Sequence, residues 1–316
     1  MAQNFSDENP RSLLAEICIV ASNDLQISYT LVLLVMNALL SIIASLGNTL
    51  ILFALHKESA LHPPSKLLFR CLALTDLLNG CISQPLYILY LVSLLPKHQD
   101  WRGDLCLYSA TFDQITTNTL CLVSLLTSTA ISIDRLLALN LGLRYRQVVT
   151  FKRTSLVLLF LWVVSIGSVS SSYPMLDYNK VEMFVGAAMC VGNLAISSFC
   201  YAKVIWKIRQ HQRRVQIINN HGTLCTDSVA LNNARYKKTV SSVLWIQLTL
   251  TICYLPLIVT VGLVSYKGPT SVLDAAWGIA ITLVYLNSSL NPFLYCWKIN
   301  EIRAAVKGIV SRLFPF

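Results

Sequence analysis

Polar side chains inside long apolar stretches are the residues of this chain that could carry chemistry. Asp76 stands in the middle of one such stretch, and another holds Asn287, Ser288 and Asn291 just before Pro292. A carboxylate within a membrane needs a cation, a proton or several hydrogen-bond donors. A proline frees a backbone carbonyl that neighbouring polar groups must satisfy. Taken singly, each of these residues fits a structural role as well as a functional one.

A third stretch carries the largest set of polar side chains. They are Asp113, Gln114, Thr117, Asn118, Ser124 and the pair Asp134-Arg135. The sequence has no Ser/His/Asp set, no paired catalytic carboxylates and no Gly-rich phosphate loop, so we expect no enzyme. The 10 Cys form no Cys-x-x-Cys pair and the 5 His lack metal-ligand spacing, which argues against a zinc or redox site.

The composition is that of an integral membrane protein. Hydrophobic residues make up 55% of the 316 residues, charged residues only 13%, and the mean hydropathy is +0.59. A soluble domain carries roughly 25% charged residues. The net charge of +10 does not indicate nucleic acid, because membrane proteins place Lys and Arg on their cytoplasmic loops.

Seven apolar stretches are each long enough to cross a hydrocarbon core of about 30 Å. They run at about 28–55, 67–95, 106–139, 155–176, 183–208, 239–265 and 272–297. We therefore expect an all-α membrane protein, a seven-transmembrane helix bundle over 28–297. Residues 1–27 would form an N-terminal tail, and 298–316 a short amphipathic interfacial helix and cytoplasmic tail, since its apolar and basic residues fall on opposite helical faces.

Lys and Arg residues predict the orientation. With the N-terminus outside, most of the 25 Lys and Arg residues fall on the inner side, as the positive-inside rule requires. The N-terminal tail is then extracellular, and Asn4 begins an N-glycosylation sequon there. The longest connection, about 209–236, is basic and lies inside.

The ordered set of short motifs resembles the rhodopsin-like (class A) G-protein-coupled receptors over about residues 28–314. The matching residues, each on its expected span, are Gly47-Asn48, Leu72 to Asp76, Asp134-Arg135-Leu136, Gly142 to Tyr145, Trp162, Tyr201, Cys253 to Pro256 and Asn291 to Tyr295. Within that family the short connection between spans four and five, which lacks a cysteine, resembles most the melanocortin, cannabinoid, lysophospholipid and adenosine group.

The resemblance implies roles for particular residues. An allosteric sodium site would comprise Asp76, Ser124, Asn287, Ser288 and Asn291, and an acid with hydroxyl and amide oxygens suits a hard cation. G-protein coupling and activation would involve Asp134, Arg135, Leu143, Tyr201, Pro256, Asn291, Pro292 and Tyr295. Activation would proceed through an outward movement of the sixth helix, with the two prolines supplying the bends for that motion. The expected partners are a heterotrimeric G protein, an extracellular ligand and the lipid bilayer. The expected location is the plasma membrane.

Several positions depart from the family pattern. The inner end of span six reads Arg235-Tyr236-Lys237-Lys238 and lacks the acid that pairs in some members with Arg135, so appreciable basal signalling is expected. Tyr254 replaces the usual tryptophan before Pro256. The usual outer disulfide cannot form, which leaves Cys106 either paired with Cys18 or free.

The ligand pocket should open outward between the helices. Candidates by helical facing are Asp113, Gln114, Thr117, Tyr254 and Tyr285. Aminergic receptors have an Asp where Thr117 stands, although Asp113, one turn outward, could serve a cationic ligand. Opsins have a lysine where Tyr285 stands, which excludes retinal chemistry. A small molecule, a peptide and a lipid ligand all remain open.

Two other functions compete with a receptor. Asp76 and its polar neighbours could line the ion path of a transporter or channel, although internal repeats and a charged line across all spans are missing. A non-signalling seven-helix partner protein is the other alternative, to which Leu136 and Tyr254 lend some support. The intact Asp134-Arg135 and Asn291-Pro292 motifs favour the receptor.

Overall fold

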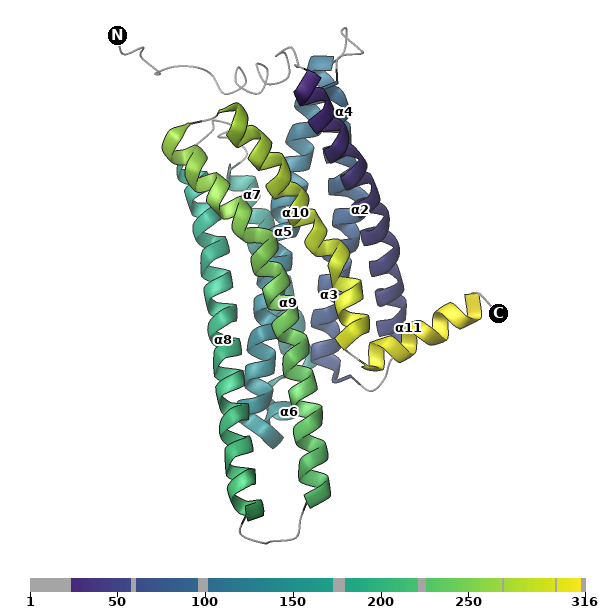
Figure 1. The fold of residues 1–316 in the computed structure, drawn as a ribbon, viewed down its shortest axis with the longest axis vertical. Coiled ribbons are helices and arrows are strands. Elements are labelled where there is room, and N and C mark those ends of the chain that lie inside the picture. The colour runs from purple at the N-terminus through teal and green to yellow at the C-terminus, as the bar shows by residue number, and fades with distance from the viewer. Residues whose placement is uncertain are drawn as a thin grey trace.

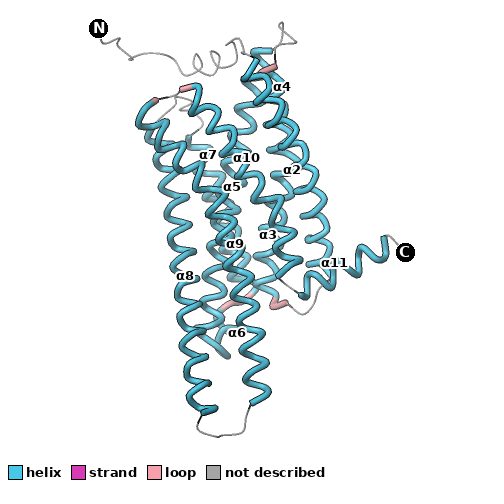
Figure 2. The backbone as a smooth tube through the Cα atoms, in the orientation of Figure 1, coloured by secondary structure: helices cyan, strands magenta, loops and turns pink. Residues whose placement is uncertain are grey.

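Long, roughly parallel helices make up this protein in a computed structural model (Figures 1 and 2), which describes residues 24–57, 61–95, 102–172, 180–220, 226–268, 270–298 and 300–313. Within these ranges, some side chains are not described. They are those of 24–25, 102–103, 143, 171–172, 180–183, 211–212, 214–220, 226–244, 246, 298, 300–301 and 313. The described ranges contain no strand.

Within the described ranges, seven helical columns form the bundle. In chain order they are α2 (Asp24–Lys57), α3 (Pro63–Leu78) with η1 (Asn79–Ser83) and α4 (Gln84–Ser93), α5 (Arg102–Leu141), α7 (Phe151–Ser172), α8 (Lys180–Asn220), α9 (Thr226–Lys267) and α10 (Ser271–Lys298). The short η2 (Gly142–Arg144) and α6 (Tyr145–Val148) follow α5, and α11 (Asn300–Leu313) comes last. The predicted seven-helix architecture is confirmed.

A π-helical turn divides the second column. Six helices of the described chain are each long and apolar enough to span a membrane, whereas α3, η1 and α4 have only 16, 5 and 10 residues. Pro85 has no N–H to donate to the preceding turn. The Gly80 carbonyl instead accepts a hydrogen bond from Ser41 Oγ of α2 at 2.7 Å. A Cβ on Gly80 would lie 2.7 Å from Ser45 Oγ, so a glycine is required where α2 and η1 touch.

Helices α8 and α9 are longer than the sequence indicated. They continue to Asn220 and start again at Thr226, so most of the connection expected at about 209–236 is helical. Figure 1 shows both helices extending side by side beyond the other columns. The basic connection between the two spans is therefore largely helical, because helical propensity needs no apolar composition at that end.

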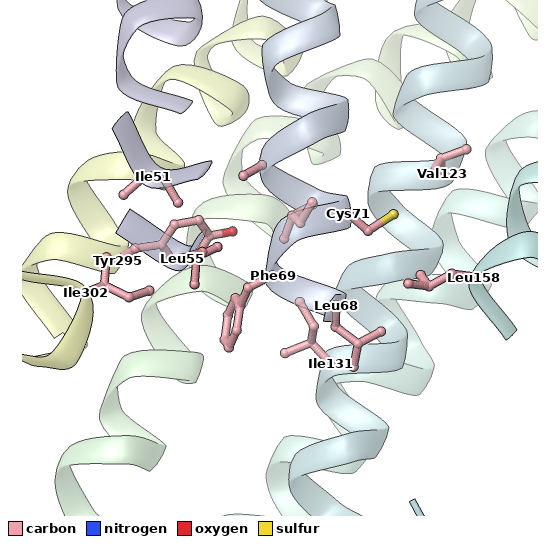
Figure 3. Close-up of a cluster of buried hydrophobic side chains, with 12 residues drawn as sticks. Ile51, Leu55, Leu68, Phe69, Cys71, Val123, Ile131, Leu158, Tyr295 and Ile302 are labelled. Atoms are coloured by element: carbon pink, nitrogen blue, oxygen red, sulfur yellow. The ribbon is translucent and has the colours of Figure 1, made fainter. Parts of the chain in front are cut away.

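The inner half of the bundle holds the largest apolar core (Figure 3). It joins α2, α3, α5, α7, α10 and α11 through Ile51, Leu55, Leu68, Phe69, Cys71, Leu72, Ala73, Val123, Ile131, Leu158, Tyr295 and Ile302. Ile302 buries α11 against this core, whereas Arg303, Lys307 and Arg312 are exposed. An amphipathic helix of this kind suits the membrane interface.

Large apolar side chains cover the outside of the bundle. Leu46, Leu156, Phe160 and Phe184 are 64%, 66%, 65% and 71% exposed. In water such a surface would cause aggregation, but lipid tails are as apolar as these side chains. Apolar residues outside and polar residues inside therefore indicate a multi-pass membrane protein.

Candidate ligand, ion and coupling sites

Three predicted ligand residues meet near the outer end of the bundle. Asp113 and Thr117 lie one turn apart on α5, and Tyr285 faces them from α10. Asp113 Oδ1 accepts hydrogen bonds from Tyr285 Oη at 2.7 Å and from Thr117 Oγ1 at 3.0 Å. The two hydroxyl oxygens lie 2.6 Å apart. Helical spacing places Asp113 and Thr117 on one face, so three of the predicted ligand residues form one hydrogen-bonded group.

Aromatic rings adjoin this carboxylate. The Tyr87 ring of α4 lies 5.7 Å from that of Tyr285 and 6.0 Å from that of Tyr90, measured between centroids. Tyr87 and Tyr285 are both buried. An acid beside several aromatic faces is suited to an organic cation, since a ring face attracts positive charge.

The other two predicted ligand residues lie apart from this group. Gln114 is exposed and takes no part in the hydrogen bonds of Asp113 and Thr117. Tyr254 is 2% exposed and belongs to an apolar cluster with Leu125 and Leu250, against which Cys121 packs. It therefore lies deep in the bundle, where it can respond to packing changes rather than contact solvent.

The predicted ion site surrounds Asp76 in the middle of the bundle. Asp76 is fully buried, and its Oδ2 accepts a hydrogen bond from Asn291 Nδ2 at 2.7 Å. Asn79 Nδ2 donates to Ser288 Oγ at 3.3 Å, and Asn48 Nδ2 to the Ser288 carbonyl at 3.1 Å. Four of the five predicted ion-site residues lie on α3 and α10, and the three hydrogen bonds tie α10 to α3, η1 and α2.

Buried oxygens without a protein partner remain in this region. They include Asp76 Oδ1 and Ser124 Oγ. Asn287 of α10, another predicted residue, is also buried. Unpaired buried oxygens are costly, and a small hard cation with its waters would satisfy them. The donor set thus fits sodium, although the described residues hold no cluster of three His, Cys, Asp or Glu side chains.

At the inner end, Asp134 collects three partners. Its carboxylate accepts from Tyr145 Oη of α6 at 2.6 Å and from Ser65 Oγ of α3 at 3.0 Å. Arg135 Nη2 lies 3.1 Å from Asp134 Oδ2. Arg135 therefore pairs with the acid that precedes it in its own helix. The Arg135 guanidinium also lies 6.0 Å from the centre of the Phe69 ring.

At neutral pH, Tyr145 and His62 keep the protonation states that suit their contacts around Asp134. Burial raises the pKa of Tyr145 to about 12, and its hydrogen bond to Asp134 acts in the same direction, so the hydroxyl remains a donor. His62 stacks on Tyr145 with ring centroids 5.2 Å apart. Burial lowers the pKa of His62, and the charge of Asp134 only partly opposes this. His62 is thus neutral beside the carboxylate.

Apart from Leu143, the remaining predicted coupling residues lie on α8, α9 and α10. Pro256 is inside α9 and Pro292 inside α10, where each removes a helical hydrogen bond. Tyr201 of α8 and Tyr295 of α10 are both buried. The Leu143 side chain lies outside the described residues, as do Asn4 and Cys18.

Cys106, at the outer end of α5, is part of a disulfide bond. The alternative of a free Cys106 is therefore excluded. Seven other cysteines of the described chain are free, so the partner lies outside the described residues.

A buried acid in mid-bundle, an acid-arginine pair at the inner end and proline bends in two columns together define a seven-helix membrane receptor. Residues 47–295 match the family "7 transmembrane receptor (rhodopsin family)". The chain belongs to that family. It is accordingly a receptor that binds an extracellular ligand and activates a heterotrimeric G protein, and not an enzyme.

Known relatives are distant but cover most of the chain. Trace amine-associated receptor 9 of mouse is 24% identical over 98% of this chain and 94% of its own length. The rat histamine H2 receptor is 25% identical over 92% of this chain and 82% of its own length. These relatives favour a receptor over the transporter and silent-protein alternatives. The finer resemblance to the melanocortin group stays a prediction.

Several contacting residues were not singled out from the sequence. Ser65 binds Asp134, Asn79 binds Ser288, and Tyr87 packs on Tyr285. Ser and Asn in apolar helices are common, so their type alone gives no signal. Asp76 and Asn79 are three residues apart, so their shared helical face could have been read from the sequence. The π turn after Asn79 hides the register of Tyr87.

Proposed function

We propose that the ligand of this receptor is an organic cation whose ammonium group binds Asp113. The observation that carries the proposal is the arrangement around that carboxylate, where Thr117 and Tyr285 both donate to the same oxygen, Oδ1. Oδ2 is then available for a ligand charge. The rings of Tyr285 and Tyr87 supply aromatic faces beside it.

The names of the relatives support this ligand class. They are receptors for trace amines and for histamine. In this chain Thr117 occupies the position at which aminergic receptors place their acid, and Asp113 lies one turn farther out. A cation bound at Asp113 would therefore sit closer to the extracellular surface and select a differently shaped amine.

A matched screen tests the ligand class. Primary, tertiary and quaternary amines would be assayed beside neutral analogues of the same shape, with G-protein recruitment as the readout. We expect some amines to act and Asp113→Asn to weaken them about 10-fold or more, as expected for loss of a buried charge partner. Tyr108→Phe, on an exposed residue of α5, is the control. Activation by a neutral lipid, or an amine response unchanged in Asp113→Asn, would contradict the proposal.

We also propose that sodium binds at Asp76 and stabilises the inactive state. Support comes from the buried, unpartnered Asp76 Oδ1 and Ser124 Oγ. When bound, the ion would supply the positive charge that these oxygens lack. Because a ligand shifts an equilibrium only by its differential affinity, the test is thermal unfolding in sodium against choline. Asp76→Asn should abolish the difference, and an unchanged sodium effect in that variant would rule the site out.

For G-protein coupling we propose Arg135 as the central contact, with Asp134, Leu143, Tyr201, Pro256, Asn291, Pro292 and Tyr295 in supporting roles. Arg135 is 24% exposed in its side chain and pairs within its own helix. Ligand-free recruitment of each G-protein class should be measurable and should disappear in Arg135→Ala at matched surface level. Equal recruitment in both proteins would exclude constitutive coupling through Arg135.

The proposed setting is the plasma membrane, with the N-terminus outside and Asn4 glycosylated. The basic inner ends of the helices support this orientation.

A further inference from the structure

Two tryptophans join the inner parts of α9 and α10. The ring centroids of Trp245 and Trp297 are 5.4 Å apart and their planes are inclined by 55°. The side chains are 42% and 52% exposed, so the contact lies at the surface of the bundle. Tilted aromatic pairs at this distance attract one another beyond simple burial. A contact that joins two helices also limits the distance between them.

Trp297 belongs to the part of the bundle that is held in place. Arg303 of α11 donates Nε to the Cys296 carbonyl at 2.7 Å, and its guanidinium also bonds the carbonyl of Trp297. Tyr295 is fully buried and packs edge-on against Phe69 at 5.6 Å. Figure 3 places Tyr295 beside Ile302 of α11 in the inner core. The end of α10 is thus tied both to α11 and to the core.

Trp245 belongs to the part that would move. It precedes Pro256 by about three helical turns, or ~16 Å. A tilt of α9 by about 20° at that proline would carry Trp245 roughly 5–6 Å sideways, by the same geometry. Aromatic pairs interact only up to a centroid distance of about 7 Å. An outward swing of α9 therefore has to break the contact with Trp297.

We propose that Trp245 and Trp297 are positioning residues that hold the inner part of α9 against α10 in the inactive receptor. They take over the restraint that an acid near Tyr236 would exert on Arg135, since the stretch Arg235 to Lys238 contains no acid. Arg135 is paired instead with Asp134 of its own helix. The proposal rests on the proposed coupling through Arg135 and on movement of α9.

Ligand-free G-protein recruitment by the full-length receptor, at matched surface level, tests the pair. Trp245→Ala and Trp297→Ala should each raise recruitment about 2- to 10-fold, the factor by which an aromatic pair shifts an equilibrium. The double variant should rise no further than either single variant, because one contact is lost only once. Trp245→Phe, which keeps a ring, should stay near the wild-type level.

Trp206→Ala is the matched control, since Trp206 is 57% exposed on α8 and lies outside the pair. If recruitment depends on Arg135 but is unchanged in Trp245→Ala and Trp297→Ala, the proposal for the tryptophan pair is wrong and the coupling assignment of Arg135 stands. The proposal for the pair is also wrong if recruitment rises equally in Trp206→Ala. It is wrong as well if the fold-increase in the double variant equals the product of the two single fold-increases. Recruitment that is independent of Arg135 in the wild type rejects the coupling assignment, and the proposal falls with it.

Discussion

The shortest hydrogen bond that Asp134 accepts comes from Tyr145, with 2.6 Å between Tyr145 Oη and Asp134 Oδ1. Tyr145→Phe removes that donor and keeps the ring that stacks on His62. We expect the variant to lose about 1–3 kcal/mol of stability, the cost of leaving a charged, buried acceptor without its donor. Thermal unfolding of the purified receptor measures the loss. Tyr108 is 63% exposed, so Tyr108→Phe should unfold at the same temperature as the wild type. If Tyr145→Phe also unfolds at the wild-type temperature, the role given to the hydrogen bond is contradicted.

The lowered pKa of His62 predicts that the stability of the receptor depends on pH. The pKa of His62 in the folded receptor is lowered from the usual 6.5, with burial as the largest cause. The unfolded chain therefore takes up a proton first as pH falls, and stability is lost below about pH 6.5. Unfolding temperature should drop between pH 7.5 and 5.5 by a larger amount in the wild type than in His62→Asn. Parallel pH profiles for the two proteins would refute this assignment.

Residue types gave a good account of the polar sites but not of their exact membership. Asp113, Thr117 and Tyr285 were predicted from helical facing and do meet. Gln114 was predicted by the same reasoning and is exposed instead, because one residue along a helix turns a side chain by about 100°. Tyr145 was noted only as part of a motif, since nothing in a sequence says which hydroxyl folds back onto which acid.

At the scale of the helix, Gly47 marks the closest approach of α2 to the bend in α10. A Cβ at this position would lie 2.8 Å from Pro292 Cγ, which neither backbone can relieve. Gly47→Ala should therefore cost about 1–3 kcal/mol of stability through overpacking. The control is Gly167→Ala on α7, where a Cβ meets nothing within 4 Å and helix propensity improves. The unfolding temperature should fall in Gly47→Ala and stay equal or rise in Gly167→Ala. The reverse order would disprove the close contact.

Helix positions were predictable from apolar length, and helix interruptions were not. Seven spans were predicted, and six of them are single helices in the described chain. The π turn at Asn79–Ser83 depends on three features together: the missing N–H of Pro85, the hydroxyl of Ser41 and the bare Cα of Gly80. Ser41 lies on α2 and Gly80 on η1, so the pattern becomes visible only after these two elements are packed together. The length of α8 and α9 was missed for a similar reason, because their inner ends are polar.

For the whole molecule, the seven-column bundle follows from hydropathy because the bilayer leaves helices as the only spanning structure available to such a chain. The outward-facing Leu46, Leu156 and Phe160 show the same rule in the packed protein. Ligand identity does not follow in this way, because it depends on the few side chains near Asp113 and on their relative positions. The π turn, which is not readable from periodicity, sets where Tyr87 meets Tyr285.

The disulfide of Cys106 is a prediction about the whole molecule. Seven of the 10 cysteines are free and Cys106 is bonded, which leaves Cys18 and Cys225 as candidate partners. In the sequence Cys225 falls between the end of α8 at Asn220 and the start of α9 at Thr226. The positive-inside rule assigns that basic connection to the inner side, whereas Cys106 stands at the outer end of α5. We therefore expect Cys18, which would tie the N-terminal tail to α5.

Mass spectrometry of an unreduced digest should find the peptides of Cys18 and Cys106 joined. Cys18→Ser and Cys106→Ser should each lower stability by about 2–4 kcal/mol, the usual contribution of a disulfide that closes a long loop. The double variant should be no less stable than either single variant, because both remove the same bond. Cys225→Ser should leave unfolding unchanged. A peptide pair that joins Cys106 to Cys225 would place the two ends of the bundle on one side of the membrane and so overturn the orientation as well.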